Sequence, residues 1–155
     1  MTTFTFRINI SIGSEIPINN IGGSFTGLTY DESDIGGGIY EVNIHWSSFS
    51  RNSNSDGLIF FNMSYNNNTS IDVTQFNNIP LANEGSQFKN FGGNFSAVDS
   101  PIISTNCKRL FYAAINFNSN IDHWIMDSVT SLQDAFKNAY VFNQPLNSWN
   151  TSKTS

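Results

Sequence analysis

Alternation of apolar and polar residues predicts β-strands in the first half of the chain. Residues 3–12 place Phe or Ile at every second position, and residues 39–47 do the same with Tyr, Val, Ile and Trp. A period of two residues is typical of a strand with one buried face. Further strands are predicted at 24–30, at 58–65, which begins apolar on both faces, and at 70–76. Five strands with intervening Gly-, Asn- and Ser-rich turns predict an antiparallel sheet or small sandwich.

From about residue 86 the spacing of apolar residues changes from two to three and four. The positions with this spacing are Leu110, Ala113, Ala114 and Phe117, and then Leu132, Ala135, Phe136 and Ala139. A period near 3.6 residues predicts short amphipathic helices. Each helix is expected to be followed by a Phe-Asn turn, a Trp and an extended Ser/Thr segment.

Residues 110–130 and 135–155 are two copies of one pattern, F-x-x-A-x-x-F-N-x-x-[IL]-x-x-W. The framework residues are Phe111, Ala114, Phe117, Asn118, Ile121 and Trp124 in the first copy and Phe136, Ala139, Phe142, Asn143, Leu146 and Trp149 in the second. A fixed period of this length is typical of a solenoid, whose coils bury their apolar faces against one another. A weaker copy begins at Phe88-Lys89-Asn90 and continues with Phe91 and Phe95.

Residues 142–152, with Phe136 and Ala139 before them, resemble the repeat of BspA-type leucine-rich-repeat surface proteins. The resemblance covers 110–155 well and 88–155 with the weaker copy. It implies a binding or display surface without a catalytic motif. The chain departs from that family in its small number of coils, in the lack of a signal peptide, and in an end that falls in mid-coil.

Together, the two patterns predict an α+β fold. Residues 1–85 are expected to form an antiparallel β domain, as a sheet or a sandwich. Residues 86–155 are expected to form a short leucine-rich-repeat-like solenoid of two to three coils. A chain of 155 residues is long enough for one good core or two small ones.

Charge and hydropathy narrow the classes of partner. Charged residues make up 12% of the chain and the net charge is -5, which argues against nucleic acid, because phosphate binding needs a basic face. Asn and Ser supply the polarity instead, and such a surface suits packing in an assembly. No apolar window is long enough to cross a membrane, and the first residues lack the pattern of a signal peptide. Membrane insertion is therefore not expected, and synthesis and folding are expected in the cytosol.

One acidic stretch is a candidate metal site. Asp31, Glu32 and Asp34 precede three glycines, 36–38, and carboxylate oxygens are suitable calcium ligands. The spacing lacks the EF-hand order, so a solvated acidic loop is the favoured interpretation. The glycines are not followed by Lys-Ser/Thr, so a phosphate-binding loop is not expected.

No catalytic residue, metal ligand or cofactor is predicted elsewhere. His45 and His123 have no partner at catalytic or metal-ligand spacing, and both are interpreted as surface residues. Cys107 occupies the position that Leu132 holds one copy later, which favours core packing, and a single cysteine excludes an internal disulfide. Six N-x-[ST] triplets, at Asn9, Asn62, Asn67, Asn68, Asn94 and Asn150, are expected by chance in an Asn- and Ser-rich chain.

Two repeated polar and aromatic positions have both a functional and a structural interpretation. Trp124 and Trp149 are suited to stacking on sugar rings, but their fixed period favours a structural role at the end of each apolar layer. Asn118 and Asn143 are expected to be buried at a turn, where they would satisfy neighbouring backbone groups.

These observations predict a non-enzymatic structural or surface-interaction protein that binds other protein subunits. The narrowest expectation is a minor capsid or other virion protein of a large DNA virus, located in the virion or assembled particle after cytosolic synthesis. A cell-surface location reached without a signal peptide is the alternative. The competing function is a carbohydrate-binding or adhesion module, in which Trp46, Tyr40 and Tyr65 would stack on a glycan.

The end of the second copy is the predicted interface. Phe142, Leu146 and Trp149 are expected in the outermost layer, covered from one side only, because no further copy follows. Full burial of three such side chains is worth roughly 1.5–3 kcal/mol each, which a partner would gain. Trp149→Ser is expected to weaken association more than it destabilises the isolated chain.

Overall fold

The computed structural model describes residues 2–9, 24–26, 29–46, 48–50, 70–81, 83 and 85–155. The strands are β1 (Thr2–Asn9), β2 (Ser24–Thr26), β3 (Thr29–Gly36), β4 (Ile39–Trp46), β5 (Ser48–Ser50), β6 (Ser70–Gln75) and β7 (Asn94–Phe95). No helix occurs within these residues. The strand predicted at 58–65 lies outside the described residues.

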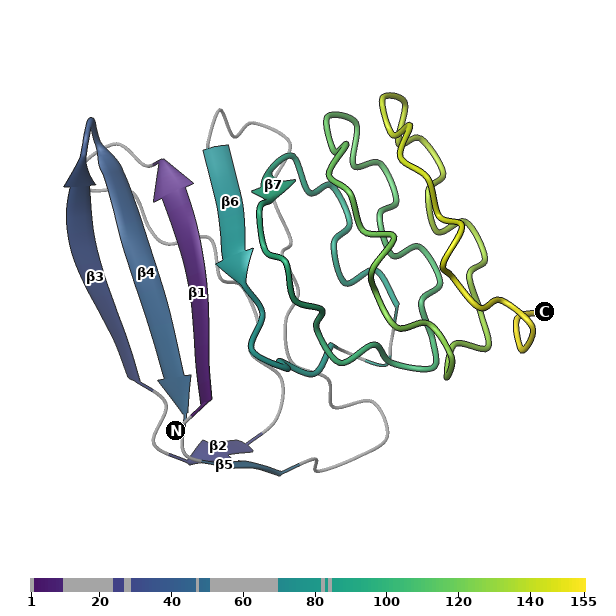
Figure 1. Ribbon diagram of the computed structural model, residues 1–155, viewed down its shortest axis with the longest axis horizontal. Helices are drawn as coiled ribbons and strands as arrows, with labels where there is room; N and C mark the ends of the chain where they lie inside the picture. Colours follow the sequence, from purple (N-terminus) through teal and green to yellow (C-terminus); the bar gives the residue numbers. More distant parts are fainter. Residues whose placement is uncertain are drawn as a thin grey trace.

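The larger sheet has five strands in the order β3-β4-β1-β6-β7 (Figure 1). The β3–β4, β4–β1 and β1–β6 pairs are antiparallel, and β6–β7 is parallel. Phe6 on β1 is in register with Val42 on β4 and with Val73 on β6, and both valines are fully buried. β2 and β5 form a separate antiparallel pair.

β3 and β4 form a hairpin that includes the acidic stretch. Asp31, Glu32 and Asp34 belong to β3 and are exposed, so they lie on a strand and not in a loop. β3 is the edge of the sheet, where charged side chains oppose pairing with a second chain. The turn is made by glycines 36–38 with φ of 95°, 66° and 76°, a conformation that costs glycine little.

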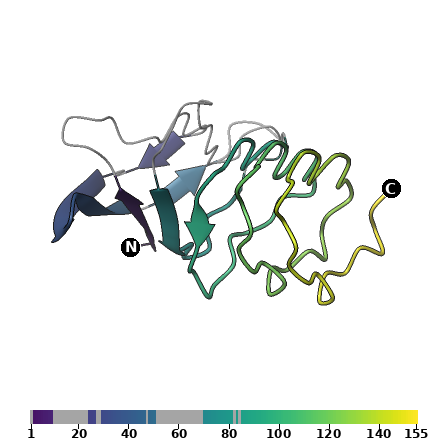
Figure 2. The same cartoon turned by 90° about the horizontal axis from the view of Figure 1, so that it is seen from above.

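Beyond β6 the chain forms three segments of similar backbone structure, placed side by side (Figures 1 and 2). The first segment is 85–91, the second is 106–114 and the third is 131–139. Amides of the first donate to carbonyls of the second in the pairs Ser86–Lys108, Phe88–Leu110 and Asn90–Tyr112, at 2.8–2.9 Å. Amides of the second donate to carbonyls of the third in the pairs Cys107–Ser131, Arg109–Gln133, Phe111–Ala135 and Ala113–Lys137, at 2.7–2.9 Å. These bonds form a ladder that runs through all three segments.

Within each segment, amides at alternate positions close tight turns. In the second segment the Tyr112 amide donates to the Arg109 carbonyl and the Ala114 amide to the Phe111 carbonyl, each at 3.1 Å. Arg109 and Ala113 have φ of 58° and 55°. The same left-handed conformation recurs at Ser86 and Asn90 in the first segment and at Asp134 and Asn138 in the third. A left-handed residue at every fourth position interrupts the chain before an α-helix can form.

The predicted α+β fold with a short leucine-rich-repeat-like solenoid is therefore wrong. The described chain consists of strands and irregular segments, and the region expected to be helical contains only turns. Successive turns with i to i+3 hydrogen bonds also return side chains to one side every three to four residues. Leu110, Phe111, Ala114 and Phe117 are accordingly all fully buried.

Aromatic rings form columns that join neighbouring copies of the repeat. Phe88 stacks on Phe111 with 5.2 Å between ring centroids, and Phe111 stacks on Phe136 at 5.5 Å. A second column joins Phe117 to Phe142 at 5.8 Å. Phe88 is thus the counterpart of Phe111, so the weaker copy beginning at Phe88 has the same place in the structure as the two clear ones.

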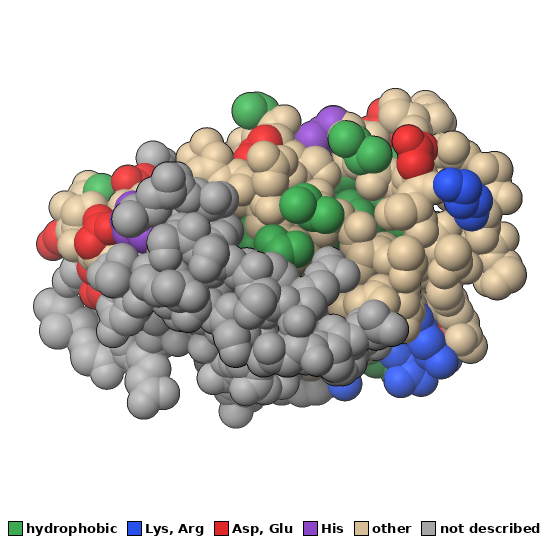
Figure 3. All heavy atoms as spheres, turned by 90° about the horizontal axis from the view of Figure 1, so that it is seen from below, with side chains coloured by type: hydrophobic (Ala, Val, Ile, Leu, Met, Phe, Trp, Pro, Cys, Tyr) green, Lys and Arg blue, Asp and Glu red, His purple; other side chains and the backbone are tan. Residues whose placement is uncertain are grey.

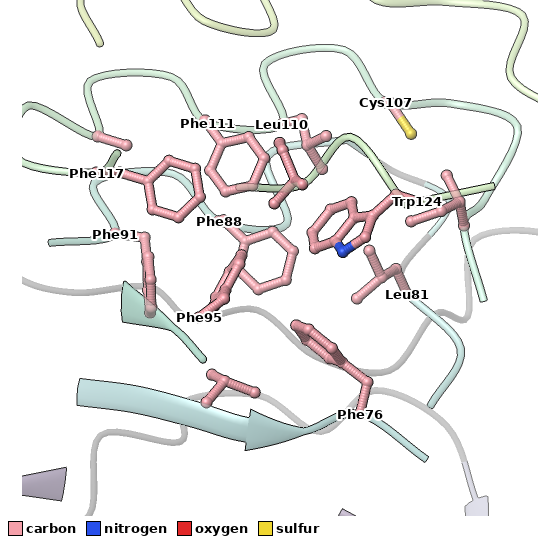
Figure 4. Packing of buried hydrophobic residues seen from close by; sticks show 14 of the residues in the cluster. Phe76, Leu81, Phe88, Phe91, Phe95, Cys107, Leu110, Phe111, Phe117 and Trp124 are labelled. Carbon is pink, nitrogen blue, oxygen red and sulfur yellow. The ribbon is translucent and has the colours of Figure 1, made fainter. Parts of the chain in front are cut away.

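The sheet and the segments share one cluster of buried residues (Figure 4). Phe76, just after β6, packs edge-on against Trp124 with 5.7 Å between ring centroids. Phe95 on β7 stacks on the same indole at 5.6 Å. The cluster extends from Val42 to Trp149. The domain boundary between residues 85 and 86 stays a prediction.

A candidate interaction surface on the third segment

The two clear copies of the repeat differ in how completely their framework residues are covered. Every apolar framework residue of the first copy is buried: Phe111, Ala114, Phe117, Ile121 and Trp124. In the second copy, Phe136, Ala139, Phe142 and Leu146 are only half-buried. The third segment covers the first copy, whereas no described residue covers the far side of the second. We call the half-buried side chains of Leu132, Phe136, Phe142 and Leu146 the outer face.

Trp149 does not contribute an exposed ring to the outer face, contrary to expectation. It is buried, with 9% exposure, and its Nε1–H donates to the Ile121 carbonyl at 2.9 Å. Its ring lies 6.0 Å from that of Phe136. Loss of this side chain would destabilise the chain itself, so Trp149→Ser is not a clean probe of association. Phe142 and Leu146 are half-buried, and their role in an interface stays a prediction.

The backbone at the outer face carries a row of amide groups. Leu132, Asp134, Phe136 and Asn138 are the counterparts of Cys107, Arg109, Phe111 and Ala113, whose amides donate to the third segment. None of the four counterpart amides has a hydrogen-bond acceptor among the described residues. We call this row of amides the donor edge. The sequence does not show which backbone groups form the donor edge, because backbone groups leave no residue-type signal.

Polar side chains also join neighbouring copies. The Asn143 amide donates to Asn118 Oδ1 at 2.8 Å, so Asn118 satisfies a backbone group as predicted in kind. Both asparagines are exposed, however, and the prediction of burial is wrong. Asp122 accepts hydrogen bonds from the Ser148 amide and hydroxyl, each at 2.8 Å, and these bonds lower the pKa of the Asp122 carboxyl.

The Asp–Ser contact between copies was missed by sequence reasoning. Asp72 and Ser96 make the same pair of bonds 24 residues apart, with the Asp72 carboxylate accepting from the Ser96 amide and hydroxyl at 2.9 Å. The Asp122–Ser148 pair has a separation of 26 residues. An Asp and a Ser one repeat apart is the signal that would have identified both contacts.

The candidate metal and catalytic residues do not form a site among the described residues. Asp31 accepts from Asn43 Nδ2 at 3.3 Å and lies 2.5 Å from His45 Nε2, on the exposed β3–β4 hairpin. His123 is exposed, with Nε2 3.1 Å from the Asp99 carbonyl oxygen. No group of three His, Cys, Asp or Glu in the described ranges is arranged to hold a metal ion.

Cys107 lies in the core, where the repeat places it. Its thiol is fully buried and donates to the Ser104 carbonyl at 3.4 Å. Burial raises the pKa of the Cys107 thiol to about 12, because a thiolate there would lose its hydration. The thiol is therefore unsuited to nucleophilic or metal-binding chemistry.

Basic side chains lie at the end of the molecule that the three segments form. Acidic side chains gather at the β3–β4 hairpin but also occur at the segment end (Figure 3). Lys89 and Arg109 both lie over the Tyr112 ring, at 5.9 and 5.6 Å from its centroid. Arg109 and Lys137 flank Asp134 at 3.9 and 3.8 Å. These exposed pairs contribute little to stability, because solvent screens them.

Comparison with known families places the three segments and the outer face in one matched range. Residues 74–155, more than half of the chain, match the sequence model of a family described as "Mycoplasma protein of unknown function, DUF285". Comparison with curated proteins and with solved structures found no match. The described residues hold no helix of the length and apolarity that a membrane span requires.

Proposed function

The chain belongs to the DUF285 family, and we propose that it is a non-enzymatic structural or surface-interaction protein that acts as a subunit of a larger assembly. The outer face binds another polypeptide in that assembly. The proposal rests on one observation, which is the difference in burial between two copies of the same repeat.

The first copy shows what the framework looks like when it is covered. Phe111 and Phe117 are fully buried between neighbours, and their counterparts Phe136 and Phe142 are half-buried. Leu146 is likewise half-buried, whereas its counterpart Ile121 is fully buried. Completing the burial of each of these three side chains would contribute on the order of 1 kcal/mol, about half of the value for full burial. A partner that covers all three gains a few kcal/mol, which offsets part of the cost of association and leaves the rest to further contacts with the partner.

The resemblance of the repeat to BspA-type surface proteins supports a role in binding or display. The narrower prediction of a minor capsid or virion subunit of a large DNA virus draws on the sparse charge and the Asn- and Ser-rich composition. A location on the cell surface fits the same composition. The glycan-binding alternative depends on Trp46, Tyr40 and Tyr65, whose side chains lie outside the described residues, and no observation favours it.

The proposal can be tested by sedimentation of tagged full-length chains from the producing cells. The wild-type chain is expected in a fast-sedimenting assembly, and Phe142→Ser is expected in the slow monomer fraction. Tyr140→Ser is the matched control, because Tyr140 is 78% exposed and lies outside the outer face. Thermal unfolding of both purified variants shows whether each is folded. A wild-type chain that sediments as a monomer, or a Phe142→Ser chain that stays in the assembly, contradicts the proposal.

A further inference from the structure

We infer that the occupant of the outer face is a segment of the same repeat frame from a partner chain, bound through its backbone carbonyls. A second copy of the outer face, related by a two-fold axis, is not the occupant. This inference rests on the proposed function and adds the chemistry of the partner. It follows from the direction of the hydrogen bonds in the ladder.

The ladder bonds between segments run in one direction over most of their length. The amides of Cys107, Arg109, Phe111 and Ala113 donate toward the third segment, and the first segment donates toward the second in the same way. Among the described residues, ladder bonds in the opposite sense occur where the ladder begins, where the amides of Thr130 and Ser131 donate to the Thr105 carbonyl at 2.8 and 3.4 Å. One copy later the Ser155 amide already donates to the Thr130 carbonyl at 3.2 Å.

The carbonyls along the donor edge are already used within the segment. Those of Leu132, Asp134 and Phe136 accept turn bonds from Ala135, Lys137 and Ala139 at 3.0–3.1 Å. In the second segment the equivalent carbonyls also accept turn bonds and receive none from the third segment. Among the described residues, the donor edge therefore presents four N–H groups, while the carbonyls of Leu132, Asp134 and Phe136 are directed into the turns of their own segment.

An edge of this kind selects its partner by hydrogen-bond polarity. Two donor edges brought together would leave every amide unpaired and desolvated, which is unfavourable. A segment that presents carbonyls at alternate positions satisfies all four amides. Within this chain that arrangement occurs in the carbonyls of Ser131, Gln133, Ala135 and Lys137, which accept from the second segment. A partner segment of the same frame would present the same carbonyl edge.

The side chains of the outer face fit the same occupant. Phe136 ends the column of rings that starts at Phe88, and Phe142 ends the column that starts at Phe117. The Phe positions of a partner repeat would continue both columns. Asn118 Oδ1 binds the amide of Asn143, and the exposed Asn143 side chain would bind the equivalent amide of the partner. Backbone and side chains thus specify the same register.

The test uses the full-length chain and a labelled synthetic peptide with the sequence of residues 131–155. Fluorescence anisotropy is expected to show saturable binding with a Kd below about 1 mM. Very tight binding is not expected, because the peptide loses conformational freedom when it binds. Amide hydrogen exchange at Leu132, Asp134, Phe136 and Asn138 should slow at least ten-fold in the complex. A peptide that carries both Phe136→Ser and Phe142→Ser should not bind.

A variant of the chain tests the donor edge directly. Leu132→Pro removes one amide that has no acceptor among the described residues, and it also replaces a side chain of the outer face. Leu132→Ala keeps the amide and is therefore the matched control. Leu132→Pro should weaken peptide binding about three- to ten-fold more than Leu132→Ala does, the value of one hydrogen bond. Tyr140→Ser should leave binding unchanged.

Three results would overturn the inference: no binding up to that concentration, binding that leaves the four amides in fast exchange, or a two-fold dimer cross-linked through the outer face. If the peptide fails to bind but the Phe142→Ser chain sediments as a monomer, the inference is wrong and the proposed function stands. If the peptide fails to bind and the Phe142→Ser chain stays in the assembly, the proposed function is wrong as well.

Discussion

Two adjacent alanines distinguish the turn structure of the second segment from a helix. Ala113 has φ of 55° and is half-buried, and its amide donates to the Lys137 carbonyl. Ala114 is fully buried and is not in the left-handed region. Replacing each alanine by glycine in turn changes the same few atoms in two different backbone conformations. The structure predicts opposite signs for the two changes in stability.

The magnitudes follow from backbone conformation and burial. The left-handed conformation costs an alanine roughly 1–2 kcal/mol, while glycine loses about 0.5–1 kcal/mol more conformational freedom on folding. Ala113→Gly should therefore raise the free energy of unfolding by about 0.5–1 kcal/mol. Ala114→Gly loses a buried methyl, worth about 0.8 kcal/mol, and also carries the entropic cost of glycine. It should lower the free energy of unfolding by about 1.5 kcal/mol.

The measurement is urea unfolding at equilibrium, followed by tryptophan fluorescence, with the midpoints compared at a common slope. Asn138→Gly in the third segment is a further check, because asparagine tolerates the left-handed conformation and the gain should be smaller. In a helix, both alanine replacements would destabilise by about 1 kcal/mol. A loss of stability in Ala113→Gly comparable to that in Ala114→Gly would therefore refute the turn structure.

Three further predictions concern close backbone approach, thiol burial and acid stability. Gly85 has φ of 80°, and a Cβ there would lie 2.4 Å from the Lys108 carbonyl oxygen. Gly85→Ala should therefore lower the free energy of unfolding by about 2 kcal/mol or more. Gly92→Ala is the matched control, because nothing lies within 4 Å of its Cβ, and urea midpoints should show little change. Cys107 should react with a thiol reagent at pH 8 only as fast as the chain unfolds, because burial raises its pKa to about 12; a fast labelling phase in the native protein would contradict its burial. Folding lowers the pKa of the Asp122 carboxyl below its ordinary value of 3.8, so the ionised carboxyl stabilises the folded chain at pH values above 3.8. This stabilisation is lost as the pH falls through the lowered pKa. The advantage of the wild type over Asp122→Asn in thermal unfolding should therefore shrink in acid, and an advantage independent of pH would show that the Ser148 bonds do not lower the pKa.

The sequence located several elements and misassigned others, for identifiable reasons. Alternation placed strands close to β1, β4 and β6 because each of these strands has a period of two. The strand residues 31–36 were expected to be a loop, because acidic residues are rare in strands. An edge strand tolerates them, because it pairs with β4 on one side only.

The helical assignment failed because turns and helices share the same spacing of apolar residues. Conformation separates the two, and the left-handed positions Ser86, Arg109 and Ala113 are of residue types that seldom adopt it. The other left-handed positions of the three segments, Asn90, Asp134 and Asn138, are of types that adopt it more often. The repeat identified which apolar residues of the first copy are buried, since identity at fixed spacing reflects shared packing. It did not show that Trp149 is covered by its own chain, because that depends on the bond from Nε1 to the Ile121 carbonyl.

The direction of the ladder bonds also governs how the molecule would respond to a pulling force. The bonds run from segment to segment, along the line on which the segments are placed, and residue 155 lies at the far end of that line (Figure 1). Tension applied at that end loads the bonds of the third segment first, so the segments detach one after another. Each detachment would release about 25 residues, or roughly 80 Å of extended chain. A subunit pulled at residue 155 would therefore lengthen in steps under load before its sheet is disturbed.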